Sequence, residues 1–163
     1  MEAVQPFVPA GWSAPRRLVS ARFVLEPLGP RHNDADYAAW SSSIAHIRST
    51  PGFATWSWPR EMSLEENLAD LEMHARHFEE QTGFTYTVRE SATGDIVGCV
   101  YIYPLRGGEA EAANEPASQA SVRSWVRADR AELDAPLWED VSAWLERDWP
   151  FTAYSYATRA DAG

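Results

Sequence analysis

The chain has 163 residues, of which 45% are hydrophobic and 23% charged, proportions that are typical of a soluble globular protein with its own core. Acidic residues outnumber basic ones by 24 to 14, and the formal net charge is −10 at pH 7. This balance argues against nucleic acid and anionic membranes as partners, because both bind positive charge. No stretch resembles a signal peptide or a membrane span, and the single cysteine, Cys99, permits no internal disulfide, so we expect a cytoplasmic protein.

The N-terminal segment predicts an arm followed by a strand. Residues 1–15 contain three prolines and no hydrophobic period, so we expect a flexible arm, with a single domain over 16–163. Within 17–28, Phe23 and Leu25 lie two residues apart in an alternating pattern, which is typical of a strand.

A helix is expected over 33–47. Tyr37 and Trp40 begin a series of apolar residues at three- and four-residue steps, which forms one face of a helix. Asn33 or Asp34 is the expected cap at its start, since both side chains accept hydrogen bonds from free backbone N–H groups.

A second helix begins at a capping box. Ser63 and Glu66 have the spacing of that motif, and Gly83 marks the end of the helix. We expect its buried stripe to consist of Leu64, Leu68, Leu71, Ala75 and Phe78.

The second half of the chain predicts mainly strands. In the second strand of a hairpin, Ile96 and Gly98 share one face if the alternation is regular, and both faces are apolar, which indicates a central strand. A loop rich in glycine, alanine and glutamate is expected over 105–117. The expected elements are strands over 84–90, 96–104 and 118–127, a helix over about 135–148 and a last strand within 151–159.

The order of these elements predicts the fold class. A strand and two helices precede three antiparallel strands, and the final strand–helix–strand crossover should place its two strands parallel. The result is an α/β (α+β) domain with a mixed, mostly antiparallel sheet flanked by helices.

Over about residues 22–156 the chain resembles the GNAT superfamily, and within it the branch of ribosomal-protein alanine N-acetyltransferases. The resemblance rests on RFVLEPL as first strand, on the hairpin that ends in IVGCVYIYP, and on SWVRADR leading into a helix. Proteins of this family transfer an acetyl group from acetyl-CoA to an amine. The resemblance therefore implies that fold, that cofactor and that reaction.

The family binds the cofactor pyrophosphate in the turn after its fourth strand, with the pattern Gln or Arg, two residues, Gly, one residue, Gly or Ala. Arg130 and Ala135 match the first and last positions, whereas Leu133 replaces the middle glycine. Glu132 and Asp134 add negative charge beside the place that the resemblance gives to the pyrophosphate.

Two interpretations of this turn are open. In one, arginines of the turn offset the acids and the N–H groups hold the pyrophosphate. In the other, Asp134 caps the helix and Leu133 fills the cleft, which closes the cofactor site. The resemblance places the cofactor against Trp125, Val126, Arg127, Arg130, Ala131, Glu132, Leu133, Asp134 and Ala135.

Catalytic residues follow from the needs of acetyl transfer. An amine must lose a proton, and Glu90 at a strand end is a candidate general base, with a merely solvated side chain as the alternative. Relatives often use a tyrosine as general acid toward the leaving thiolate. Here Tyr154 or Tyr156 takes that role, or the acid is missing or displaced.

The loop STPGFATWSWP is the expected substrate lid, because aromatic side chains in a proline-bounded loop suit the wall of a ligand site. A hydrophobic plug over the sheet is the alternative. The pair His74 and His77 lacks further ligands nearby, so no metal site is expected. The expected substrate-binding residues are His46, Arg48, Phe53, Trp56, Trp58, Tyr101 and Tyr103.

These observations lead to one hypothesis and one alternative. The chain is expected to move an acetyl group from acetyl-CoA to an amine of a small molecule or protein. The alternative is a catalytically inactive GNAT-like module that binds a ligand or partner. A homodimer through an exposed edge strand is one expected form of partnership.

Overall fold

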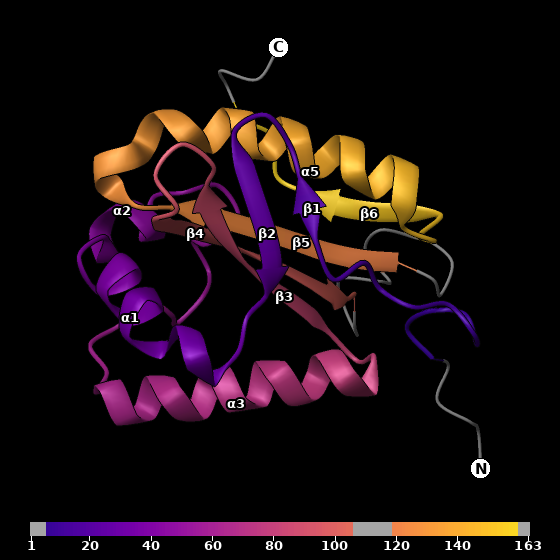
Figure 1. Ribbon diagram of the computed structural model, residues 1–163, viewed down its shortest axis with the longest axis horizontal. Helices are drawn as coiled ribbons and strands as arrows, with labels where there is room; N and C mark the ends of the chain where they lie inside the picture. Colours follow the sequence, from indigo (N-terminus) through magenta and orange to yellow (C-terminus); the bar gives the residue numbers. More distant parts are fainter. Residues whose placement is uncertain (1–5, 106–118, 160–163) are drawn as a thin grey trace.

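The computed structural model describes residues 6–105 and 119–159, and a six-stranded sheet forms its centre (Figure 1). The strands lie in the order β1-β2-β3-β4-β5-β6. All neighbours are antiparallel except β5 and β6, which are parallel, so the mixed sheet and its closing crossover are confirmed. The strands are β1 (Leu18–Val19), β2 (Phe23–Pro27), β3 (Phe84–Glu90), β4 (Ile96–Pro104), β5 (Gln119–Val126) and β6 (Ala153–Tyr156).

Helices cover the sheet on both sides. Figure 1 shows α3 along one side of the sheet and α5 along the other. On the α5 side, Leu137, Val141 and Trp144 enter the larger hydrophobic cluster, as the helical pattern predicts. The helices are α1 (Asn33–Ser41), α2 (Ile44–Arg48), α3 (Leu64–Glu80) and α5 (Asp134–Asp148), with short 3-10 turns at Pro30–His32 and Ala128–Leu133.

The single helix predicted over 33–47 is wrong, because the chain breaks at Ser42 and Ser43 into α1 and α2. The Ser43 hydroxyl accepts a hydrogen bond from the N–H of Ala128 at 2.8 Å, so the break is tied to the turn that precedes α5. The predicted cap is also wrong. His32 precedes α1 without a side-chain cap, and the Asn33 amide donates instead to the carbonyl of Leu64 at 3.1 Å.

Helix α3 begins as predicted and buries most of its predicted stripe, except at its first residue. The capping box is confirmed, with Ser63 and Glu66 bonded at 2.9 and 3.0 Å. Leu64 is 42% exposed, whereas Asn67 is only 2% exposed. Leu71 and Phe78 of the predicted stripe are buried as expected, whereas Leu64 is not, and the polar Asn67 also faces the protein interior.

The N-terminal arm differs from its prediction over the part that the structure describes. Phe7 stacks on Phe151 with ring centroids 5.0 Å apart, and Trp12 lies 5.1 Å from Trp149. These residues pack against the sheet rather than extending freely. Of the loop expected over 105–117, all but Leu105 lies outside the described residues.

A bulge in β4 changes the predicted alternation. Arg89 pairs with Ile96 and Val88 pairs with Gly98, so Val97 is an extra residue. Ile96 consequently joins the cluster on the α1 side, while Val97 joins the cluster on the α5 side. Gly98 is required here because a Cβ would overlap the carbonyl oxygen of Trp125 on β5.

Candidate active site

A cavity of about 390 Å³ lies between α1, α3 and the sheet. This volume is within the range of small-molecule sites. Trp56 and Trp58 of the predicted lid contribute to its wall, and Tyr101 and Tyr103 of β4 complete the aromatic part. The structure thus brings these four predicted substrate residues together.

The aromatic wall is closely packed. Tyr101 lies 5.9 Å from Trp56 and 6.1 Å from Trp58, measured between ring centroids. The Arg123 guanidinium stacks over Trp56 at 4.4 Å and donates to the carbonyl of Gly52 at 2.8 Å. These contacts join the loop to the sheet and hold the aromatic wall in place.

The other predicted substrate residues do not line this cavity. Phe53 is buried and packs edge-on against Trp56 at 5.3 Å. His46 belongs to α2, where its carbonyl accepts from the Thr50 hydroxyl at 2.9 Å. Arg48 is exposed and donates to the carbonyl of Ser57 at 3.3 Å.

Asp36 forms an acidic corner of the cavity, and sequence reasoning missed it. The side chain comes from α1 and is 4% exposed, with Oδ2 accepting from Asn67 Nδ2 at 3.1 Å. Burial raises the pKa of Asp36 to about 6, partly offset by the Asn67 hydrogen bond, and the nearby Asp70 adds to the rise. The available signal was its position four residues before Trp40, on the inward face of the helix.

Two histidines and a tyrosine form a second polar group in the cavity wall. The Tyr103 hydroxyl lies 2.9 Å from Nδ1 of both His74 and His77, and the Thr85 hydroxyl is 3.0 Å from His74 Nδ1. Burial, with His77 as a smaller cause, lowers the pKa of His74 to about 4. His74 is therefore neutral at pH 7, and the described residues contain no group suited to a metal ion.

Strand β5 continues beyond its partner β6. The parallel pairing ends at Val122 and Tyr156, and residues 123–126 extend past it. The Tyr156 hydroxyl is 2.6 Å from the Ser124 hydroxyl, and burial raises the pKa of this tyrosine. The Ser124 carbonyl accepts from Arg159 Nη2 at 2.9 Å.

The start of α5 contradicts the interpretation in which Asp134 and Leu133 close the turn. Leu133 is 6% exposed and packs in the larger hydrophobic cluster. Asp134 does not cap α5, because it is itself the first helical residue. Its carboxylate instead accepts from Arg159 Nε at 2.6 Å, and Arg159 is 6% exposed. Sequence reasoning missed this arginine because the partners are far apart in the chain.

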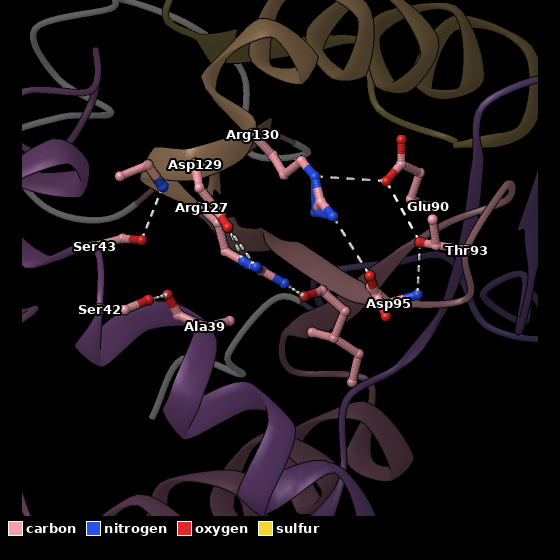
Figure 2. A network of polar contacts seen from close by, with 11 residues as sticks. Ala39, Ser42, Ser43, Glu90, Thr93, Asp95, Arg127, Asp129 and Arg130 are labelled. Atoms are coloured by element: carbon pink, nitrogen blue, oxygen red, sulfur yellow. Dashed lines mark hydrogen bonds and ion pairs between the residues drawn. The ribbon is translucent and has the colours of Figure 1, made fainter.

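The arginines of the turn are each paired with acids (Figure 2). Arg127 donates to both carboxylate oxygens of Asp129, at 2.9 and 2.7 Å. Arg130 lies 3.5 Å from Asp95 and 3.9 Å from Glu90. The predicted base Glu90 thus belongs to a surface ion pair, away from the aromatic cavity.

The remaining predicted catalytic and cofactor residues do not gather at one site. The Tyr154 hydroxyl donates to Glu146 at 2.7 Å, and burial together with this carboxylate raises the pKa of Tyr154 to about 12. Trp125 is buried and its indole N–H donates to the Tyr101 hydroxyl at 2.9 Å. Among the other predicted cofactor residues, Val126 is buried and Ala135 is partly buried. Ala131 and Glu132 are exposed.

Comparison with known proteins finds similarity in structure only. No protein-family model matches the chain, and no curated protein matches it in sequence. An acetyl transferase from Salmonella typhimurium that modifies the N-terminal serine of a 50S ribosomal subunit protein is similar with a TM-score of 0.58 and 12% identity, over 79% of this chain and 64% of that one. RimL in complex with coenzyme A has a TM-score of 0.57 and 11% identity, over 80% and 67% of the two chains.

A third solved structure, the microcin C7 self-immunity acetyltransferase MccE with acetyl-CoA and AMP, has a TM-score of 0.54 and 12% identity, over 78% of this chain and 62% of that one. The chain thus spans 62–67% of the length of these three proteins. Together with the sheet order, these similarities show that the chain has the GNAT fold. Among the described residues, no helix is long and apolar enough to cross a membrane.

Proposed function

We propose that this chain transfers an acetyl group from acetyl-CoA to an amine bound in the aromatic cavity. One observation carries the proposal. Residues 123–126 of β5 extend beyond β6 toward α5, and the same strand contributes Ser121 and Arg123 to the cavity wall. If the pantetheine arm of acetyl-CoA lay along this edge of β5, its thioester would reach an amine bound in the cavity.

Acetyl-CoA would supply an activated thioester, and two of the structurally similar acetyltransferases hold CoA or acetyl-CoA. The chain's own residues then have separate tasks. The cavity orients the amine, and the backbone at residues 125–126 polarises the carbonyl, as the GNAT resemblance implies. Asp36 and His74, together with Asp70 and His77, are the groups of the cavity wall that can accept a proton, in place of Glu90, which does not line the cavity. Tyr156 lies at the open edge of β5 and is better placed than Tyr154 to protonate a leaving thiolate.

The edge of β5 and the start of α5 differ in how well they suit the parts of CoA that they would contact. The edge of β5 suits the pantetheine arm, except where Arg159 bonds to the Ser124 carbonyl. The start of α5 suits a pyrophosphate only after Asp134 leaves Arg159, because a phosphate there would meet the carboxylate. Arg130 Nη1 is buried without a hydrogen-bond partner, which leaves one donor for an anion near the turn.

Calorimetric titration with acetyl-CoA and with CoA tests the proposal. Micromolar binding, followed by acetylation of amines detected by mass spectrometry, is the expected result. Absence of binding at millimolar cofactor would refute it. Pairing of two copies through an edge strand and a cytoplasmic location are further parts of the proposal, and gel filtration tests the first.

A second function is favoured by the contact between Arg159 and Asp134. This partly buried ion pair fills the junction of β5 and α5 with the chain's own side chains. A GNAT-fold module that binds a small ligand without chemistry would keep such a contact permanently. The two functions differ in the same titration, because only the enzyme binds CoA.

A further inference from the structure

The aromatic cavity contains a buried carboxylate with no cationic partner. Asp36 Oδ2 accepts from Asn67, and within the described residues no arginine, histidine or second donor bonds to either oxygen of Asp36. Buried carboxylates in proteins are normally paired, because a lone buried charge is costly. The missing partner therefore points to a ligand.

We propose that this cavity binds an organic ammonium ion with a flat apolar body, whose nitrogen bonds to the free carboxylate oxygen of Asp36. The inference rests on the proposed function in one respect, since it names the class of acceptor amine. It does not depend on acetyl-CoA, because the recognition residues belong to the cavity alone.

The neighbours of Asp36 favour a cation at this end of the cavity. Asp70 of α3 also lines the cavity and adds a second negative charge. His74 adds no positive charge at neutral pH, since burial keeps its imidazole neutral. The other charged group, Arg123, lies on the β5 wall, where it stacks on Trp56 and donates to the Ser121 hydroxyl at 2.7 Å. The charges thus orient the ligand, with its nitrogen toward α1 and α3.

The side chains of the cavity walls favour an apolar body for the rest of the ligand. The rings of Trp58 and Tyr101 lie 6.1 Å apart in a T-shaped arrangement and present apolar surface to the cavity. Leu28 and Met73 add aliphatic surface. Such walls stabilise an aromatic or aliphatic body by burial, and aromatic faces also attract a cation. A small hydrophilic amine would leave this surface unused.

Three probes of similar shape and different charge test the inference without cofactor. We expect 2-phenylethylammonium to bind at least tenfold more tightly than 2-phenylethanol, and 3-phenylpropionate to bind weakest, measured by calorimetry on the wild-type protein at pH 7.5. Equal binding of the ammonium and the alcohol would overturn the inference, as would preference for the carboxylate or no binding of any probe.

Variants then assign the selectivity to one residue. Asp36→Asn keeps the shape and the Asn67 contact, so it should remove the preference for the ammonium over the alcohol. Asp34→Asn removes the same charge from the exposed side of α1 and should leave the preference unchanged. Retained selectivity in a folded Asp36→Asn variant would contradict the inference.

The outcomes separate this inference from the proposed function. If the ammonium binds through Asp36 but no acetyl transfer occurs with acetyl-CoA, only the proposed function fails. If acetyl transfer occurs with no effect of Asp36→Asn on amine selectivity, only the inference fails.

Discussion

Asp134→Asn should strengthen CoA binding, because it removes the carboxylate that accepts from Arg159 at the start of α5. Asparagine has the same shape and retains an oxygen that accepts from Arg159 Nε. The charge of the guanidinium, whose side chain is 4% exposed, is then no longer balanced by a carboxylate and attracts a phosphate more strongly. The substitution avoids Leu133, since that side chain packs in the core.

The expected gain follows from the charge that is removed. Two like charges about 4 Å apart repel by about 1 kcal/mol in water and by about 4 kcal/mol at an effective dielectric of about 20. Because Asp134 is partly exposed, the true value lies between these limits. CoA should therefore bind roughly 5-fold to 800-fold more tightly to the variant. The folded state should lose about 1–3 kcal/mol, which is less than complete removal of a buried partner costs.

Calorimetry with CoA on the wild type and variant measures this gain, and thermal unfolding checks the fold. Glu132→Gln is the matched control, because it removes one charge from an exposed residue of the same turn. A similar gain in CoA affinity in both variants would mean that the loss of any negative charge in the turn has the same effect, without a specific role for the Arg159–Asp134 contact. No gain in a folded Asp134→Asn variant would refute the assignment of the phosphate position to Arg159.

Three further predictions concern the cavity wall and α3. The folded pKa of His74, about 4, lies below its ordinary value of 6.5, so the unfolded chain binds a proton first as pH falls. The free energy of unfolding of the wild type should therefore be at its full value above pH 6.5 and fall by about 3 kcal/mol toward pH 4 through this residue. Urea unfolding of His74→Gln over the same pH range should not show this decrease. Gly83→Ala should place a methyl group against the Tyr103 ring, which would weaken amine binding in calorimetry and cost about 1–3 kcal/mol in urea unfolding. Ser63→Ala should cost about 1 kcal/mol in thermal unfolding, without changing amine affinity, because only the cap of α3 is lost.

The fold was largely predictable because its signals are local. Alternation in β3 and β4, the capping box at Ser63 and the apolar face of α5 each depend on residues close together in the chain. The bulge at Val97 was not predictable by alternation, since it reflects the approach of the Trp125 carbonyl to Gly98 from the next strand. The break at Ser43 has a similar origin, because its hydroxyl bonds to the backbone of Ala128.

The site was predictable only in its aromatic half. Trp56, Trp58 and the β4 tyrosines are conspicuous in sequence because large rings in a loop or strand must pack on something. Asp36 was not, since an acid next to a helix start is more often a solvated residue than a buried one. Only the packing of α3 against α1 brings Asn67 to Asp36 and creates the corner.

The two parts of the site differ in how ready they are for a ligand. The cavity has a formed wall and a carboxylate without a cation, so amine binding adds an interaction and displaces none of the protein's own. The junction of β5 and α5 has its donor, Arg159, already satisfied by Asp134 and the Ser124 carbonyl, so phosphate binding must break these contacts first. A ligand that must displace an internal partner gains only the difference between the two interactions. The amine side should consequently bind its ligand with the free protein, whereas CoA affinity should be set mainly by the strength of the Arg159–Asp134 contact.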